Sequence, residues 1–357
     1  MALALAAGFW LGRKTLAWRR RIRFRDKAVL LTGGSRGLGL AMARRLAREG
    51  ARLALVARDP RELDAAAGEL ATCGVEVLPI VADLTVEGDA ERAVEETLRA
   101  FRRLDVLINN AGIIQVGPLD SLTLGDFDRA MATHFGGPLR LILAALPHLE
   151  ASGAGRLVNV SSIGGRIAVP HMAPYCASKF ALTGLSEALR AELAERGVLV
   201  TTVTPGLMRT GSYLHAMFKG RRGSELDWFG VSSSLPLLTM NADRAAKKIL
   251  AACREGRPTL TLTPQARAAE IVDRLLPGAT ARITELASAV LPAPPEDGEA
   301  GIEPVPGHRL SSRWTQSPLT LLGRRAARRN RELPPPPPGV VPTPPAEPPP
   351  AVPRPLP

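Results

Sequence analysis

The chain has 357 residues with a formal net charge of +12, and only 4% of them are aromatic. Many basic residues lie in residues 13–25 and 324–331, and no basic stretch is interleaved with aromatic rings. The composition therefore argues against a nucleic-acid-binding protein and favours an anionic membrane surface as a partner. Cys73, Cys176 and Cys253 lie far apart without metal-ligand spacing, which predicts a reducing compartment, no disulfide and no metal site.

Residues 1–25 are predicted to associate with a membrane. Residues 1–12 are almost wholly apolar, and the basic residues follow them, whereas a secretory signal places its charges first. A helix of that length reaches only about 18 Å, less than the ~30 Å of a hydrocarbon core. We therefore expect a helix at the membrane surface, with the protein on the cytoplasmic face or in the cytoplasm. A span continued to Trp18, and a disordered or docked N-terminus, both stay open.

Short apolar runs alternate with longer helical patterns from Lys27 onward. This order is typical of βαβ units, so we predict one α/β domain over residues 26–291, a doubly wound parallel sheet covered by helices on both faces. Ligands of such sheets bind beyond the carboxyl ends of the strands. Helical patterns also cover 242–255 and 265–291. The predicted strands are 27–32, 51–57, 75–81, 104–109, 155–161, 198–204 and 258–263.

A glycine-rich segment follows the first predicted strand and leads into a helix. Glycines let backbone amides approach a pyrophosphate, and the helix N-terminus attracts its negative charge. The spacing is not the G-x-G-x-x-G fingerprint, and a simple turn between strand and helix would look similar. The position after the first strand favours cofactor binding. The segment reads Thr32-Gly33-Gly34-Ser35-Arg36-Gly37-Leu38-Gly39.

The second predicted strand ends at Ala57 and Arg58, where a carboxylate would be expected in an NAD site. Arg58 and Arg36 could instead pair with a 2′-phosphate, so we expect NADP(H) as the preferred cofactor. Asp59 keeps NAD(H) open, and two solvated arginines are the alternative interpretation. After the third strand, Asp83 and its neighbour Leu84 are placed to contact an adenine, although a helix cap would look the same.

A tyrosine and a lysine four residues apart place their side chains on one helix face, at Tyr175 and Lys179. A nearby ammonium favours the phenolate and brings the tyrosine pKa toward neutrality. The chain also carries the glycine segment, Asn109-Asn110-Ala111-Gly112, Ser162 and Pro205-Gly206. Because of these motifs and the Tyr175 and Lys179 pair, the chain resembles the short-chain dehydrogenase/reductase family over about residues 26–263. The resemblance implies a Rossmann-type fold and a nicotinamide cofactor.

The resemblance also implies a role for each matching residue. Ser162, Tyr175 and Lys179 would carry out carbonyl reduction or alcohol oxidation, with Tyr175 as proton donor and Ser162 as hydrogen-bond donor to the same oxygen. Gly33, Gly37 and Gly39 would hold the pyrophosphate, and Asn109 and Gly112 would support the adenosine half. The other residues that would contact the cofactor are Thr32, Ser35, Leu38, Asn110, Ala111, Pro205, Gly206 and Thr210.

His134 departs from the family pattern, which usually has an asparagine there. That asparagine is thought to position a water through its backbone carbonyl, completing a proton path from Lys179. His134 offers the same carbonyl, so we expect a working enzyme with an altered proton path. The alternative is a cofactor-binding scaffold or regulatory protein with impaired catalysis.

Residues 207–239 carry many large apolar side chains and are predicted to fold over a lipophilic substrate, such as a ketoacyl, steroid or retinoid compound. Covering the core or a subunit contact is the alternative, and a homo-oligomer stays open. Residues 292–357 are rich in proline and are predicted to be disordered, with 319–331 as a solvated linker or a basic turn on a membrane. The apolar lid residues are Met208, Tyr213, Leu214, Met217, Phe218, Trp228, Phe229, Leu235, Leu237 and Leu238.

Overall fold

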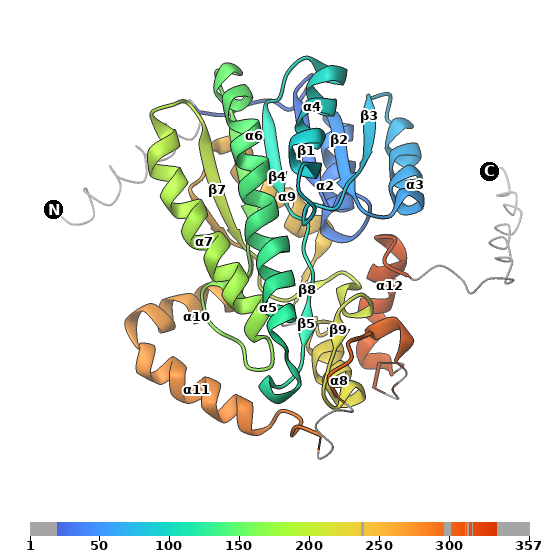
Figure 1. The fold of residues 1–357 in the computed structure, drawn as a ribbon, viewed down its shortest axis with the longest axis vertical. Coiled ribbons are helices and arrows are strands. Elements are labelled where there is room, and N and C mark those ends of the chain that lie inside the picture. Colours follow the sequence, from blue (N-terminus) through green and yellow to red (C-terminus); the bar gives the residue numbers. More distant parts are fainter. Residues whose placement is uncertain are drawn as a thin grey trace, which may run out of the picture.

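The computed structural model describes residues 20–236, 239–295, 301–310, 312, 314, 315 and 317–333. Its centre is a parallel sheet of seven strands in the order β11-β7-β6-β4-β1-β2-β3 (Figure 1). All seven predicted strands are confirmed, and so is the doubly wound α/β class. The strands are β1 (Ala28–Thr32), β2 (Arg52–Ala57), β3 (Val77–Val81), β4 (Val106–Asn109), β6 (Arg156–Val160), β7 (Leu199–Thr204) and β11 (Thr259–Thr261).

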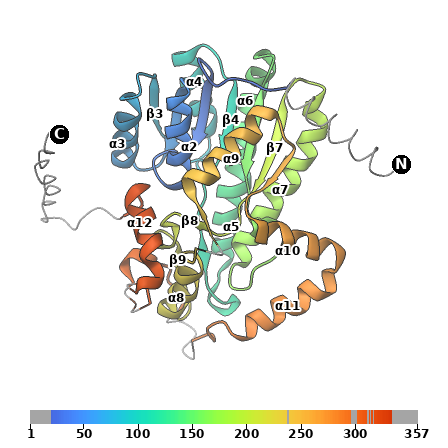
Figure 2. The same cartoon turned by 180° about the vertical axis from the view of Figure 1, so that it is seen from behind.

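Helices cover both faces of this sheet because successive strand residues point to opposite faces. In β1, Val29 and Leu31 pack in one hydrophobic cluster, and Ala28 and Leu30 pack in another. The first cluster lies under α2 (Gly37–Arg48), α3 (Pro60–Ala71) and α9 (Ala242–Glu255), which Figure 2 shows in front of the sheet. The second lies under α4 (Asp89–Phe101), α6 (Gly137–Ala151) and α7 (Ala173–Ala194).

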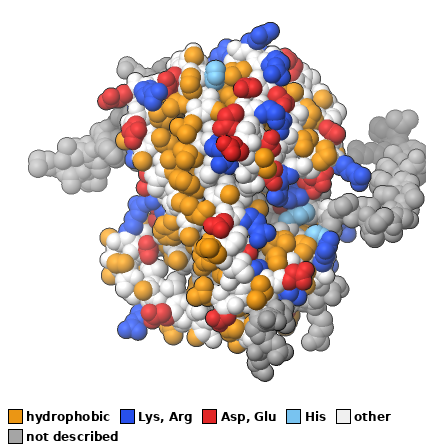
Figure 3. All heavy atoms as spheres, in the orientation of Figure 1, with side chains coloured by type: hydrophobic (Ala, Val, Ile, Leu, Met, Phe, Trp, Pro, Cys, Tyr) orange, Lys and Arg blue, Asp and Glu red, His pale blue; other side chains and the backbone are white. Residues whose placement is uncertain are grey.

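One face of the molecule exposes apolar side chains along α6 and α7. Figure 3 shows them as a band of hydrophobic side chains. Leu143 is 63% exposed and Phe180 43% exposed.

A smaller layer lies beyond the carboxyl ends of the strands (Figure 1). Its own apolar cluster includes Tyr213, Phe218 and Phe229. A buried ion pair of 2.5 Å between Lys219 and Asp126 ties it to α5 (Leu124–Met131). Its elements are α8 (Arg222–Ser232) and two small sheets, one of β5 (Gln115–Val116), β9 (Met217–Phe218) and β12 (Val305–Pro306), the other of β8 (Met208–Arg209) and β10 (Met240–Asn241).

Two helices, α10 (Pro264–Leu275) and α11 (Pro277–Ala289), extend along the lower edge of the molecule (Figures 1 and 2). No residue of α11 is buried. Leu286 is 71% exposed, and Val290 just after the helix is 83% exposed. Within the described part of the chain, no helix combines the length and the apolar character needed to cross a membrane.

The domain begins earlier than residue 26, so the predicted boundary is wrong. Ile22 and Phe24 are buried in the main cluster although arginines flank them. The Ile22 amide donates to the Arg254 carbonyl at 3.1 Å, and the Arg254 guanidinium lies 5.1 Å from the centre of the Phe24 ring. Alternation of apolar and basic side chains lets this segment pack one face on α9. The predicted membrane segment 1–19 lies outside the described residues.

The expectation of a disordered tail from residue 292 is also wrong for much of residues 301–333. β12 pairs with β9, and α12 (Leu321–Arg329) leads into residues 330–333; we call 321–333 the C-terminal strap. The small residues Ala326 and Ala327 let α12 pack closely on the layer above the sheet. The strap is held to α2 by Arg44, which donates to the Arg329 carbonyl at 2.9 Å. The proline run at 334–338 lies outside the described residues.

Candidate active site

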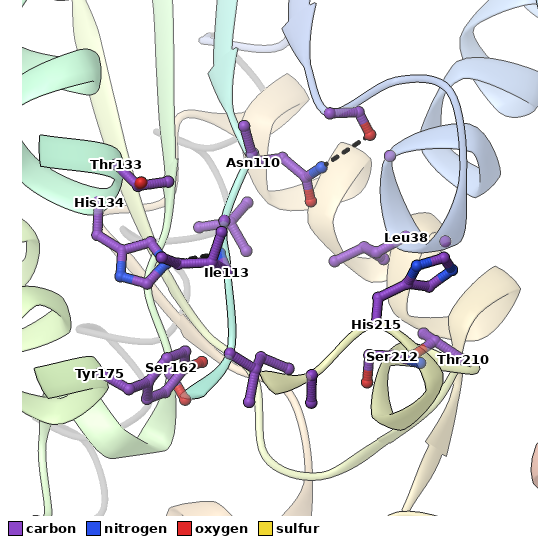
Figure 4. A pocket seen from close by; sticks show the side chains of 18 of the residues that line it. Leu38, Asn110, Ile113, Thr133, His134, Ser162, Tyr175, Thr210, Ser212 and His215 are labelled. Atoms are coloured by element: carbon purple, nitrogen blue, oxygen red, sulfur yellow. Dashed lines mark hydrogen bonds between the residues drawn. The ribbon is translucent and has the colours of Figure 1, made fainter. Parts of the chain in front are cut away.

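A cavity of about 820 Å³ opens beyond the carboxyl ends of the central strands (Figure 4). The glycine segment forms one wall, and Ser162, Tyr175 and Lys179 form part of the other. Of the predicted site residues, all but Thr32 and Asn109 line this cavity. One continuous space therefore joins the glycine segment to side chains that lie more than 100 residues further along the sequence.

The glycine segment has the backbone that a phosphate site requires. Gly33 and Gly37 adopt φ values of +66° and +60°, which other residues rarely adopt. A Cβ on Gly39 would lie 1.8 Å from the carbonyl oxygen of Gly33, so only glycine fits there. The α2 helix has no side-chain cap and no acidic residue in its first turn. Its N-terminus is therefore suited to an anion, and the segment fits the pyrophosphate of a dinucleotide.

Thr32 and Asn110 fix the glycine segment to the end of β4. The Thr32 hydroxyl accepts the backbone N–H groups of Asn110 and Ala111, both at 2.9 Å. The side-chain amide of Asn110 donates to the Thr32 carbonyl at 3.0 Å. Asn109 lies behind the cavity, where it donates to Asn159 at 2.9 Å. Thr32 and Asn109 thus act as supports for the cavity wall.

The end of the cavity beside β2 carries both arginines of the predicted 2′-phosphate site. Arg36 pairs with Glu62 at 2.7 Å, and Arg58, whose side chain is 62% exposed, lies 3.9 Å from Asp83. Asp59 caps α3 by accepting the Glu62 amide, so its carboxylate is already used by the helix. Both guanidinium groups therefore line the end of β2 while each lies near a carboxylate of the same region.

The side chains predicted to carry out the chemistry lie just after β6 and on α7. Ser162 follows β6, and its hydroxyl accepts the Gly164 amide at 3.1 Å. Tyr175 is half-buried, and Lys179 is buried one turn further along α7. The Lys179 ammonium donates to the Val160 carbonyl at 2.9 Å and lies 5.8 Å from the centre of the Tyr175 ring.

The pKa values of this pair differ from the expectation. Burial raises the pKa of Tyr175 to about 12, although its hydrogen bond with Ser162 acts in the opposite direction. Burial lowers the pKa of Lys179 to about 7. Desolvation is the largest influence on both pKa values. Tyr175 is held in its protonated form, as a proton donor should be.

The side chain of His134 is held by two polar contacts. It lies in a π-helical turn, Ala132–Gly136, between α5 and α6, and is 1% exposed. Its Nε2 accepts the Ile113 amide at 3.1 Å, and its Nδ1 lies 2.7 Å from the Ser178 hydroxyl. Because Nε2 accepts, the network assigns the proton to Nδ1, which donates to Ser178.

The ring of His134 is neutral. Burial, with the charge of Lys179 beside it, holds its pKa well below the usual value. A Cβ on Gly112 would lie 3.0 Å from Nε2, so the glycine makes room for the imidazole. The larger side chain is therefore accommodated, and it fixes the segment that follows β4.

Some side chains of the predicted apolar lid line the cavity, and others pack in the apolar cluster of the smaller layer. Met208, Trp228 and Phe229 line the cavity together with Met172. Tyr213 and Phe218 are buried in the small apolar cluster, as the alternative interpretation expected. Leu237 and Leu238 lie outside the described residues.

Among the residues that line the cavity without having been predicted are the titratable Glu62, His215 and Glu332. His215 donates from Nε2 to the Glu332 carbonyl at 3.0 Å. Burial lowers the pKa of His215 to about 4, so the ring is neutral. No local pattern marks these residues, because only the folded chain brings them to the glycine segment.

Comparisons with known proteins agree with this geometry. The family model described as short chain dehydrogenase matches residues 27–216. Dehydrogenase/reductase SDR family member 7B of Bos taurus is 33% identical over 273 residues, which cover 74% of this chain and 82% of that protein. An uncharacterized oxidoreductase of Thermotoga maritima is 33% identical over 66% of this chain and 93% of its own length.

Solved structures share the fold. Levodione reductase aligns with a TM-score of 0.59 and 27% identity over 69% of this chain and 100% of its own. L-Sorbose reductase from Gluconobacter frateurii, solved in complex with NADPH and L-sorbose, aligns with a TM-score of 0.60 and 24% identity over 68% of this chain and 97% of its own.

Proposed function

We propose that this chain uses NADP(H) and a lipophilic substrate. The premise is that it belongs to the short-chain dehydrogenase/reductase family and is an oxidoreductase acting on alcohol and carbonyl groups. The reaction interconverts a carbonyl and a primary or secondary alcohol. The observation that carries the proposal is that the glycine segment and the Ser162, Tyr175 and Lys179 side chains line one cavity.

The preference for NADP(H) rests on charge. Arg36 and Arg58 line the cavity at the end of β2, and the neighbouring Asp59 is bound to the α3 N-terminus. A 2′-phosphate gives guanidinium groups a charge-assisted contact that a hydroxyl does not. The competing pairs of Arg36 with Glu62 and of Arg58 with Asp83 reduce this advantage without removing it. NAD(H) is the second cofactor to test.

The side chains can divide the work of carbonyl reduction. The cofactor, when bound, supplies the hydride. The Tyr175 hydroxyl, protonated in this site, gives its proton to the carbonyl oxygen, and the Ser162 hydroxyl stabilises the same oxygen by a hydrogen bond. Lys179 stabilises the phenolate left on Tyr175, and His134 holds the Ile113 segment in place. Alcohol oxidation uses the same groups in reverse.

The lining of the cavity supports a lipophilic substrate. Near Tyr175 the walls are made by Met172, Trp228 and Phe229, which offer apolar area and few polar partners. A carbonyl compound with a large apolar body would bury that body against them. Ketoacyl, steroid and retinoid compounds share this property.

A membrane surface is proposed as the location. The apolar and basic sequence of residues 1–25 supports it, and so do the exposed apolar side chains of α11. Such a surface would hold lipophilic substrates near the cavity. Self-association is a separate proposal, supported by the exposed Leu143 and Phe180 on α6 and α7.

A cofactor-consumption screen tests the function. Full-length protein is mixed with NADPH and then NADH, against lipophilic ketones and aldehydes and against small polar ones as controls. We expect NADPH consumption with the lipophilic set and none with Tyr175→Phe, which keeps the ring but lacks the proton donor. Equal rates for the variant would refute the assignment of Tyr175. Cofactor binding without turnover of any compound would favour the scaffold alternative.

A further inference from the structure

The C-terminal strap closes one side of the cofactor cavity. The Asn330 carbonyl accepts the Gly37 amide at 2.9 Å, and the Glu332 carbonyl accepts Nε2 of His215 at 3.0 Å. Arg331 pairs with Glu69 of α3 at 3.0 Å. The strap is thus fastened to the glycine segment, to α3 and to the layer above the sheet, and Glu332 faces inward.

The Glu332 side chain is buried, and one of its carboxyl oxygens has no hydrogen-bond partner among the described residues. The residue is 4% exposed and lines the cavity. Its Oε2 makes no hydrogen bond within the described part of the chain. A Cβ added to Gly37 would lie 2.9 Å from Oε1, so the carboxyl group stands directly against the first residue of α2. Most buried polar groups are hydrogen-bonded, so an unpartnered carboxyl oxygen in the cavity wall calls for an explanation.

Two features make this acid unusual at its position. The N-terminus of α2 attracts anions, yet the carboxyl group accepts no hydrogen bond from it. The charged and titratable groups around it include Arg36 from the glycine segment, Glu62 from α3, and His215 and Tyr213 from the layer above the sheet. Arg36 is already paired with Glu62, and His215 is neutral. An ionised Glu332 would therefore be poorly compensated, and a phosphate anion brought to the same helix end would repel it.

We propose that Glu332 is a residue of the cofactor site, and that nicotinamide dinucleotides bind more tightly when its carboxyl group is neutral than when it is ionised. This inference rests on the proposed function, because it requires a dinucleotide at the glycine segment. It concerns the pyrophosphate, which NADPH and NADH share, so it does not depend on the 2′-phosphate preference. A neutral carboxyl group has a proton to donate, which an anionic ligand can accept.

The ionisation of Glu332 falls in an accessible range. Burial raises the pKa of Glu332 to about 8; Arg36 acts against this shift and Glu62 adds to it. A bound anion raises this pKa further, so dinucleotide binding should take up a proton above pH 8. If only the neutral form binds, the dissociation constant is nearly unchanged at pH 7 and rises about tenfold at pH 9.

The test compares full-length wild-type protein with Glu332→Gln, a neutral side chain of the same shape. Dissociation constants for NADPH and NADH are measured by calorimetry at pH 7, 8 and 9. Lys179, whose pKa is about 7, titrates in both proteins, so the ratio of the two constants isolates Glu332. We expect wild type to bind about as tightly as the variant at pH 7 and about tenfold more weakly at pH 9.

Two further measurements keep the result specific. Calorimetry in buffers of different ionisation enthalpy should show uptake of about one proton per dinucleotide at pH 9 in wild type and less in Glu332→Gln. Glu49→Gln removes the same charge at the other end of α2 and should behave like wild type. Equal affinities of wild type and Glu332→Gln at every pH would overturn the role of Glu332 alone. Failure of both proteins to bind either dinucleotide would overturn this role together with the proposed function.

Discussion

Replacing His134 should separate the work of its side chain from that of its backbone. In His134→Ala the partly buried Ile113 amide loses its acceptor, which costs about 1–3 kcal/mol. The lost imidazole also leaves a cavity beside Gly112, because the ring is 1% exposed. Ser178 keeps its bond to the Tyr175 carbonyl, so its loss is small. We expect the free energy of unfolding to fall by about 3–5 kcal/mol.

His134→Asn should be milder, because the amide oxygen of asparagine can accept the Ile113 N–H while the bond to Ser178 is lost. A reduction of about 1–2 kcal/mol is expected. Turnover in His134→Asn should equal or exceed that of wild type, because the backbone carbonyl is unchanged and the neutral, hydrogen-bonded ring is poorly suited to carry protons.

Urea unfolding followed by circular dichroism gives the stabilities, and the cofactor-consumption assay gives turnover. His148→Ala, at a partly exposed histidine of α6, is the matched control and should change stability by less than about 0.5 kcal/mol. The reasoning is refuted if alanine and asparagine at position 134 are equally stable. It is also refuted if a folded His134→Asn loses most of its turnover.

The remaining predictions concern the cofactor, the N-terminus and pH. Arg58→Ala should weaken NADPH binding by about 1.5 kcal/mol, the lower end for a bond to a charged group because Arg58 is 62% exposed, and leave NADH unchanged; equal losses would exclude the 2′-phosphate contact. Deleting residues 1–19 should move a folded protein from the membrane to the soluble fraction, whereas deleting 1–24 also removes two core residues and should destabilise the fold; a full-length protein that is wholly soluble at low salt contradicts the anchor. The pKa of Lys179 falls from 10.5 to about 7 on folding, so between these pH values the unfolded chain binds more protons than the folded one. The free energy of unfolding should therefore rise with pH in this range, and Lys179→Met should show a smaller rise in a series of urea melts.

Local patterns predicted the sheet and most of the cavity wall. Each strand of the parallel sheet is a short apolar run between helical patterns. The roles of Gly33 to Gly39 and of Tyr175 with Lys179 follow from the resemblance of the joint motif set to a family, because each spacing alone also fits an ordinary turn or helix face. These features are local because a backbone turn or one helix face requires them.

Other parts depend on contacts between distant segments. Ile22 and Phe24 alternate with arginines, so the basic composition of this segment suggested a membrane surface although its apolar side chains pack on α9. The pKa of Tyr175 depends on how fully the folded layers exclude water. The ring of His134 finds Ile113 and Ser178 only after folding. Glu332 follows a basic helix and precedes prolines, and nothing in that surrounding sequence distinguishes it from a linker residue.

The position of the strap at the end of the chain also affects folding during synthesis. Arg44 and Arg329, which hold α12 against α2, lie 285 residues apart along the chain. During synthesis the first strands and helices leave the ribosome long before their cover exists, and domains begin to fold while still attached. A sheet that forms during synthesis therefore has its glycine segment uncovered, and the cavity is enclosed only once the last described residues emerge. Early truncation would yield a Rossmann-type core with a nucleotide groove open on one side.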